Sequence, residues 1–301
     1  MPALLFTVDS VEDITPHMRR VTFAGAPVAE YIAQERFPNI KILFPLPDGT
    51  FAVPELDDPS SGADTEIRTR PDLHARVRTY TVRSYNAEKS SLSIDFVMHG
   101  DEGLASGWAA TAQPGSSLGI AGGGGRGISP ATDYLICGDE TALPAMGAIL
   151  EGLPADAQGT AYIEIGGDDD RQELSHPQGI DVRWLSRNGA DGGTTTLLID
   201  AVRAHELHED TFAWAAAESA QVIAIRKDLR ARGMARRSML VIGYWRRGLT
   251  ENGYAKSSNH DRDGREYSDD HDHDHEHTHG HGLAAAVREG ASTLASRLRR
   301  S

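Results

Sequence analysis

The sequence predicts two domains of different fold class: an antiparallel β-barrel first, followed by an α/β domain with a doubly wound parallel sheet. Two observations support this prediction. Residues 3–120 hold several short runs, some with alternating polar and apolar residues, that are separated by turns, and such runs are typical of a small closed barrel. From about residue 130, strand-like apolar runs alternate with helical segments, and this order builds a parallel sheet covered by helices.

The first domain is expected to contain short strands, a long loop and one short helix. Its expected strands are residues 6–8, 18–23, 40–44, 79–83, 91–97 and 117–120. Residues 55–71 are rich in Asp, Ser, Pro and Gly and therefore predict a loop. A glycine turn after the strand at 91–97 leads into the start of the short helix.

The second domain is expected to alternate strands with helices. Its expected strands are residues 133–137, 159–165, 181–185, 212–216 and 239–244, and its helices are 142–150, 197–205 and 219–233. Residues 251–282 have almost no apolar content, which predicts disorder. Leucine and valine spacing in 283–300 predicts an amphipathic helix. We therefore expect boundaries at 1–127, 128–250, 251–282 and 283–301.

Composition limits the classes of function. The net charge of −14 argues against a nucleic-acid partner or an anionic membrane surface, and no apolar run is long enough to span a bilayer. Cys137 is the only cysteine, so no internal disulfide can form, which fits a reducing compartment. The first residues lack the pattern of a signal peptide. We therefore expect a cytoplasmic protein without membrane insertion.

A short strand near residue 80 combines a cation, an aromatic ring and a hydroxyl. Because side chains alternate along a strand, Arg78 and Tyr80 should share one face, and Thr79 and Thr81 the other. Arg78 could pair with a phosphate, Tyr80 could pack on a flat ring system, and Thr81 could reach polar ring edges. Taken alone, this run is also compatible with an ordinary exposed strand.

A second motif follows about twenty residues later. Residues 95–100 read as a strand that ends at His99-Gly100, and residues 103–110 open a helix. A helix start offers unpaired N–H groups and a positive dipole end, which suit a pyrophosphate. Ser106 can add a hydroxyl donor to such a site.

Together the two motifs resemble the flavin-binding signature of the siderophore-interacting protein family, a branch of the ferredoxin-reductase-like flavoproteins. The resemblance continues in order along the chain. Similar segments are residues 39–45, 137–145, 214–218 and 243–248. Ala217 replaces the glycine that the family usually has, and the glycine run at 122–127 departs from a tighter family turn, which leaves the position of Arg126 open. The resemblance covers residues 1 to about 250.

The resemblance implies an FAD-binding first domain and a nicotinamide-binding second domain. It implies that FAD contacts Arg78, Tyr80, Thr81, Val97, His99, Ala105, Ser106 and Trp108. It implies that the nicotinamide side is shaped by Gly138, Asp139, Glu140, Thr141, Trp214 and Glu218. It implies a basic cluster for an anionic ferric chelate, made of Lys41, Arg126 and Arg246. No side chain is expected to be catalytic, because the flavin performs the chemistry.

The expected function is that of an FAD-dependent ferric-siderophore reductase. Electrons would pass from NADH or NADPH through the flavin to Fe(III), and Fe(II) would leave the chelator in the cytoplasm. NADH is favoured because Asp168-Asp169-Asp170 follow a predicted parallel strand, where acids accept from a ribose 2′-hydroxyl and repel a 2′-phosphate. The alternative is a non-enzymatic, flavin-containing iron- or metal-handling protein whose histidine-rich tail buffers metal.

Three further patterns are weaker. Gly122–Gly127 satisfies a G-x-G-x-x-G expression, but no helix follows, so an interdomain loop is expected. Residues 259–270 deviate in several positions from a calcium-binding loop. Alternate histidines in the tail could chelate a divalent metal flexibly, or the tail could simply be solvated. These histidines are His271, His273, His275, His277, His279 and His281.

Overall fold

The computed structural model describes residues 4–35, 37–53, 66, 69–99, 103–249 and 253–254. The chain divides into two compact units after Arg126, and each unit has its own core. Most of the predicted tail lies outside the described residues, including its six alternate histidines and the expected helix at 283–300. The same holds for most of the expected loop at 55–71.

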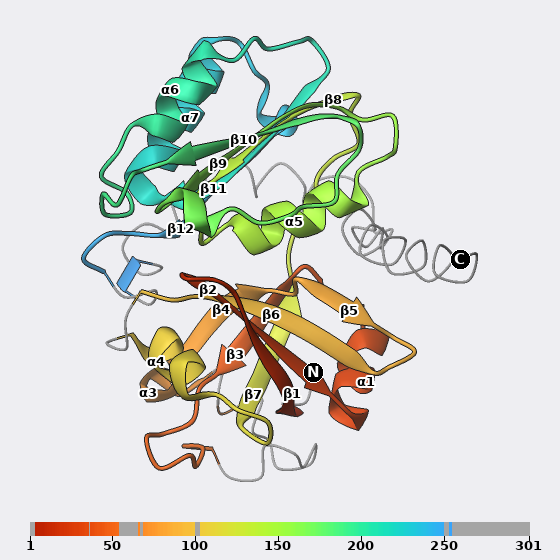
Figure 1. Cartoon of the computed structure of the whole chain (residues 1–301), viewed down its shortest axis with the longest axis vertical. Helices are drawn as coiled ribbons and strands as arrows, with labels where there is room; N and C mark the ends of the chain where they lie inside the picture. The colour runs from red at the N-terminus through yellow and green to blue at the C-terminus, as the bar shows by residue number, and fades with distance from the viewer. Residues whose placement is uncertain are drawn as a thin grey trace. The chain divides into compact units, whose positions relative to one another are not determined.

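The first unit is built on a seven-stranded antiparallel sheet (Figure 1). The strand order is β4-β3-β7-β1-β2-β6-β5. The strands are β1 Leu4–Thr15, β2 Met18–Ala24, β3 Asn39–Leu43, β4 Val77–Thr81, β5 Ser84–Asn86, β6 Ser91–Val97 and β7 Ser117–Gly124. The antiparallel sheet was predicted correctly. Closure into a barrel is not shown, because β4 and β5 are the outer strands and no pairing joins them among the described residues.

Alternating apolar residues form the core of this sheet. Phe6 and Val8 of β1 are buried together with Phe23 of β2 and Ile94 of β6, while Thr7, Thr22 and Ser93 on the same strands are less buried. Helix α1, Ala26–Ala33, contributes Tyr31, whose ring meets Phe6 edge-on at 5.8 Å between centroids. The short helices α3, Pro71–His74, and α4, Leu104–Thr111, complete this unit.

The glycine run at 122–127 was predicted to be a loop, and this is wrong for its first half. β7 continues to Gly124, and Gly122 and Gly124 lie opposite Lys41 and Asn39 of β3. The backbone φ angles are 141° at Gly122 and 132° at Gly124, in a region that residues other than glycine rarely adopt. A register shift between Lys41 and Ile42 accompanies this twist. The glycines therefore allow the strand to continue here, whereas a glycine run was expected to end it.

The second unit has a five-stranded parallel sheet in the order β10-β9-β8-β11-β12. The strands are β8 Asp133–Gly138, β9 Gln158–Ile165, β10 Gly179–Ser186, β11 Thr211–Glu218 and β12 Met239–Trp245. The helices are α5 Leu143–Gly152, α6 Leu197–Ala204 and α7 Ser219–Ala231, with 3-10 turns η1 Asp168–Asp170 and η2 Arg236–Ser238. Figure 1 shows α5 on one face of the sheet and α6 with α7 on the other. The predicted doubly wound sheet is confirmed.

The strand order places a topological switch point within this unit. The chain winds from β8 outward through β9 and β10, and then returns to the other side of β8 as β11. The carboxyl ends of β8 and β11 therefore form the topological switch point, where open α/β sheets bind ligands. β11 is buried along its whole length, as expected for a central parallel strand. In the part of the chain that the structure describes, none of the helices is both long and apolar enough to cross a bilayer.

Candidate functional site

The first unit carries the motif on β4. Arg78 lies opposite Ile42, and Tyr80 lies opposite Ile40, so the two side chains share a face as predicted. The Arg78 NH1 group donates 2.9 Å hydrogen bonds to the carbonyl oxygens of Ala75 and Val77. Thr81 ends the strand and is buried. The guanidinium is therefore held near the start of β4 by backbone acceptors.

An aromatic cluster joins this strand to the second motif. The ring of Phe96 lies 4.6 Å from the ring of Tyr80 and 5.6 Å from that of Trp108, measured between centroids. Phe44 packs edge-on against Trp108 at 5.9 Å. Tyr80 and Trp108 were singled out from the sequence, whereas Phe44 and Phe96 were not, because an apolar residue in an alternating strand reads as ordinary core. The cluster therefore packs the two motifs together.

The start of α4 contains an unpartnered buried hydroxyl. Ser106 is 2% exposed, and its Oγ has no hydrogen-bond partner among the described residues. A Cβ at Gly103 would lie 2.8 Å from Ser106 Oγ and 2.9 Å from His99 Cε1, so a larger residue at this cap would require one of these side chains to move. A free hydroxyl beside the first N–H groups of a helix suits an anionic ligand. The residues present therefore fit the phosphate groups of FAD.

The other residues expected to contact FAD lie close to these elements in the chain. Val97 ends β6, His99 follows it and is exposed, and Ala105 is half-buried in the first turn of α4. Ala105 and Trp108 pack against the core of the sheet. The residues expected to hold FAD thus all come from the same unit, on β4, β6 and α4 with their adjoining turns.

The basic residues do not all lie in one unit. Lys41 is exposed on β3, between Thr79 of β4 and Gly122 of β7. Arg126 is exposed at the end of the first unit, whereas Arg246 is exposed after β12 in the second. Neither unit alone brings the three cations together.

The second unit holds a buried carboxylate at the switch point. Asp139 is 1% exposed and follows β8. Its Oδ1 accepts hydrogen bonds from the N–H and hydroxyl of Thr141 at 2.9 and 2.5 Å. Its Oδ2 accepts from the Glu218 N–H at 3.1 Å and from Trp245 Nε1 at 2.7 Å. Burial, and then the nearby charge of Glu140, raise the pKa of Asp139 to about 6. Asp139 therefore ties together the ends of β8, β11 and β12.

Of the other residues expected on the nicotinamide side, Gly138 and Glu218 lie at the carboxyl edge of the sheet, whereas Trp214 lies within a strand. A Cβ at Gly138 would lie 2.6 Å from the carbonyl oxygen of Ala216, so the close approach of two strands requires glycine. Glu218 caps α7 by accepting from the Ala220 N–H at 2.5 Å. Both lie at the carboxyl edge of the sheet. Trp214 is instead buried within β11 and packs edge-on against Tyr244.

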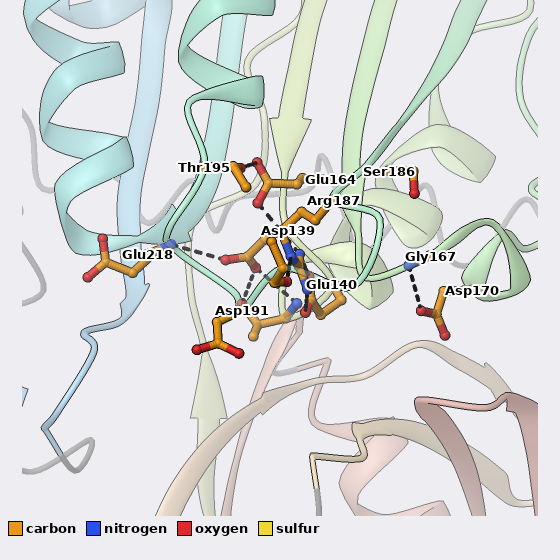
Figure 2. Close-up of polar contacts among 12 residues, drawn as sticks. Asp139, Glu140, Glu164, Gly167, Asp170, Ser186, Arg187, Asp191, Thr195 and Glu218 are labelled. Carbon is orange, nitrogen blue, oxygen red and sulfur yellow. Dashed lines mark hydrogen bonds and ion pairs between the residues drawn. The ribbon is translucent and has the colours of Figure 1, made fainter.

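Four residues at this edge were missed from the sequence. Arg187 follows β10 and forms a two-point ion pair with Glu140, at 2.5 Å for each N–O contact (Figure 2). Glu164 of β9 is fully buried and lies 3.5 Å from Arg187. Thr195 and Gln221 donate to Glu164 at 3.0 and 3.3 Å. Single charged or polar residues at the ends of different strands form no spacing motif, so only the fold brings them together.

The described residues contain no group of three or more His, Cys, Asp or Glu side chains arranged to hold a metal ion. Cys137 is buried, and burial raises the pKa of its thiol to about 12, so this residue is a packed thiol and not a nucleophile. The histidine-rich tail lies outside the described residues.

The order of the two sheets along the chain indicates the class of protein. A solved ferredoxin NADP+ reductase from Neisseria gonorrhoeae has a similar fold, with a TM-score of 0.54 over 81% of this chain and 100% of that chain. Its 11% identity makes this a likeness of fold alone. The antiparallel sheet followed by a parallel sheet is therefore a ferredoxin-reductase-like architecture.

Matches to family models show which family the chain belongs to. Residues 7–127 match the siderophore-interacting FAD-binding domain, and residues 131–248 match the siderophore-interacting protein model. The chain belongs to the siderophore-interacting protein family, as the motifs predicted, and its first unit carries the family's FAD-binding domain.

Individual relatives agree. The chain is 34% identical over 245 residues to ferric vibriobactin reductase ViuB of Vibrio cholerae, which covers 80% of this chain and 88% of that protein. It is 28% identical over 247 residues to the NADPH-dependent ferric-chelate reductase of Escherichia coli, covering 79% and 91%. A solved siderophore utilization protein from T. fusca has 38% identity and a TM-score of 0.73, covering 83% and 95%.

Proposed function

We propose that this protein is an FAD-dependent ferric-siderophore reductase that takes electrons from NADH or NADPH in the cytoplasm. The observation that carries the proposal is the unpartnered, buried Ser106 hydroxyl at the start of α4, beside a glycine cap where a side chain would crowd that hydroxyl. The relatives that are named ferric reductases support the choice of substrate. FAD, when bound, supplies the chemistry that accepts two electrons from a nicotinamide and delivers them singly to Fe(III).

The first unit would bind and orient the cofactor. The N–H groups at the start of α4 and the Ser106 hydroxyl would hold phosphate oxygens, and Arg78 would add a charge-assisted contact. Tyr80 and Trp108, already fixed by Phe96, would offer ring surface to the flavin. Rigid aromatic neighbours reduce the ordering that binding requires.

The exposed cations would attract the iron substrate. Lys41, Arg126 and Arg246 are solvent-exposed, so their attraction for an anionic ferric chelate would be long-ranged and sensitive to salt. Reduction weakens the hold of hard oxygen ligands on iron, because Fe(II) carries less charge than Fe(III). Fe(II) would therefore leave the siderophore after electron transfer. No side chain has to act as a nucleophile or a base.

The nicotinamide nucleotide would bind at the carboxyl ends of β8 and β11. The proposed preference for NADH has a narrower basis than the sequence suggested. Asp170 is buried and accepts from the Gly167 N–H at 3.2 Å, and Asp168 pairs with Arg171 at 2.8 Å. Asp169 is the one member of the triplet that stays exposed without a described ion pair. The relative from Escherichia coli is named NADPH-dependent. Lower kcat/KM for NADPH in wild type, and equal values in Asp169→Asn, would support the preference; equal values in wild type would remove it.

A simple experiment separates the reductase from the alternative, a non-enzymatic metal-handling protein. The purified protein should be yellow and should oxidise NADH or NADPH rapidly only when a ferric siderophore is present. A protein that binds several metal ions per chain, but oxidises neither nucleotide when a ferric siderophore is present, would favour the alternative and contradict the proposal.

A further inference from the structure

Arg187 is a buried cation whose contacts fix the carboxylate of Glu140. Its side chain is 4% exposed. NH1 and NH2 each donate a 2.5 Å hydrogen bond to a different oxygen of Glu140, and Nε donates to the carbonyl oxygen of Ala190 at 3.1 Å. A two-point pair of this kind sets orientation as well as distance. The Glu140 carboxylate therefore cannot turn independently of Arg187.

Glu164 is a second carboxylate that pairs with the guanidinium of Arg187 (Figure 2). Its Oε1 lies 3.5 Å from Arg187 NH1, while its Oε2 accepts from Thr195 Oγ1 and Gln221 Nε2. Burial raises the pKa of Glu164, and the hydrogen bond from Thr195 and the charge of Arg187 oppose this rise. Glu164 is thus anchored to three segments of the unit. It forms the fixed end of a triad, Glu140–Arg187–Glu164.

Glu140 is the accessible end of the triad. Its side chain is 22% exposed, compared with 4% for Arg187 and 0% for Glu164. It follows Asp139 at the switch point, so it lies where a nucleotide would bind. A carboxylate has about four acceptor positions, and Arg187 uses only two of them. The others can accept from ribose hydroxyls or from a carboxamide N–H.

The charge of Arg187 matters as much as its geometry. A nicotinamide dinucleotide carries a negatively charged pyrophosphate. An uncompensated Glu140 at the switch point would repel it, and this repulsion would be strong where water is partly excluded. Arg187 offsets part of the negative charge of Glu140, because its single cation is shared with Glu164, and it leaves other acceptor positions of Glu140 available.

We propose that Arg187 is a positioning residue for the electron donor: it orients Glu140 at the switch point and offsets its negative charge, and so enables a nicotinamide dinucleotide to bind there. This inference rests on the proposed function, because it concerns the donor site of the same reductase. It adds a residue that neither the motifs nor the family resemblance pointed to.

The test compares Arg187→Met with Arg183→Met in the flavin-loaded protein. Arg183 lies on β10, four residues before Arg187, and its ion pair with Asp181 is exposed, so it is a control. We expect Arg187→Met to raise KM for both NADH and NADPH by about tenfold, which corresponds to a loss of about 1.4 kcal/mol of binding free energy, with kcat changed much less. The increase should shrink as salt rises, because screening weakens repulsion. Arg183→Met should leave KM and its salt dependence unchanged.

A second substitution separates positioning from loss of structure. In Glu140→Gln/Arg187→Met the repelling charge is absent, so KM should return to the value of Glu140→Gln alone. Arg187→Lys keeps the charge but loses the two-point contact, and should give an intermediate KM. If Arg187→Met does not fold, this Lys variant and the double variant carry the test. Additive losses in the double variant, or a KM for the Arg187 variants equal to that of the Arg183 control, would overturn the inference.

The outcome also distinguishes this inference from the proposed function. A wild-type protein that oxidises neither nucleotide in the presence of ferric chelates would refute the reductase itself. A wild-type protein that oxidises them while the Arg187 variants retain normal KM would refute only the role of Arg187.

Discussion

The indole Nε1 of Trp245 donates a 2.7 Å hydrogen bond to the buried Oδ2 of Asp139, and so joins the end of β12 to the turn after β8. The same carboxylate oxygen accepts from the Glu218 N–H at the end of β11. One side chain therefore organises the carboxyl edge of three parallel strands. Its charge state should influence both the stability of the second unit and the shape of the proposed donor site.

Asp139 should give the stability of the protein a measurable pH dependence. Its folded-state pKa is raised to about 6 from 3.8. The folded state therefore binds more protons than the unfolded state between these values, and the free energy of unfolding should fall as pH rises from about 4 to 6. Asp139→Asn should flatten this part of the curve, measured by urea denaturation at several pH values. The exposed Asp156→Asn serves as control. A slope in Asp139→Asn equal to that of wild type would show that Asp139 does not titrate there.

Ser106 should matter for FAD and not for the protein without cofactor. Its hydroxyl is buried without a described partner, so removing it loses no hydrogen bond in the apo-protein. Ser106→Ala should leave the apo-protein as stable as wild type or slightly more stable, while FAD affinity falls by about tenfold, corresponding to a lost hydrogen bond to a charged group. Thr111→Ala in the same helix is the control. Fluorescence titration with FAD and thermal melting give the two readouts. Unchanged FAD affinity would remove Ser106 from the cofactor site.

Arg78 should contribute a charge-assisted contact to a phosphate of FAD. Loss of such a contact costs on the order of 1.5–3 kcal/mol, so Arg78→Ala should purify with much less flavin than wild type. Arg70→Ala, which removes an exposed cation that pairs with Glu66 and Asp72 of the same unit, should keep its flavin. The ratio of flavin absorbance to protein absorbance measures the effect. Wild-type flavin content and affinity in Arg78→Ala would mean that this assignment is wrong.

Lys41 and Arg246 should act on the iron substrate without affecting FAD. Both are exposed, so their replacement by alanine should raise KM for an anionic ferric siderophore at low salt and leave flavin content normal. The difference from wild type should diminish as ionic strength increases. Lys89→Ala, an exposed lysine of the first unit, is the control. If both variants keep the wild-type KM at low salt, neither residue belongs to the substrate site.

The histidine-rich tail, which lies outside the described residues, should bind divalent metal independently of the flavin chemistry. Deleting residues 259–282 and rejoining the chain should remove most zinc or nickel binding in calorimetry while FAD stays bound. Wild-type binding should weaken below about pH 6, because imidazole ligands must be deprotonated. Full metal binding after the deletion would show that these histidines are not ligands. Loss of ferric reduction with FAD still bound would instead place the tail in the electron path.

The sequence was informative where periodicity or a spaced motif exists. Alternation predicted that Arg78 and Tyr80 share a face, and the register against Ile42 and Ile40 confirms it. The alternation of strands and helices predicted the parallel sheet, and the resemblance drew attention to Asp139 before its contacts were known. These features are local, so a one-dimensional pattern can report them.

What the sequence could not show depends on contacts between distant segments. Arg187 and Glu140 are separated by 47 positions in the chain, and each is a single charged residue near a strand end. Gly124 continues a strand because its backbone takes a positive φ beside β3, whereas a glycine run normally predicts a turn. The acidic triplet at 168–170 suggested free carboxylates, but local pairing and burial engage two of its three members.

The most direct test of the reductase is anaerobic stopped-flow spectroscopy on the flavin-loaded protein. NADH or NADPH should bleach the flavin absorbance, and a ferric siderophore added next should restore it, with Fe(II) captured by a ferrous-specific chelator in a ratio of about two per nucleotide oxidised, since a hydride carries two electrons and each Fe(III) accepts one. Recovery of the flavin spectrum with at least one ferric siderophore, accompanied by Fe(II), would support the account. A flavin that nicotinamides reduce but that no ferric chelate reoxidises would contradict it.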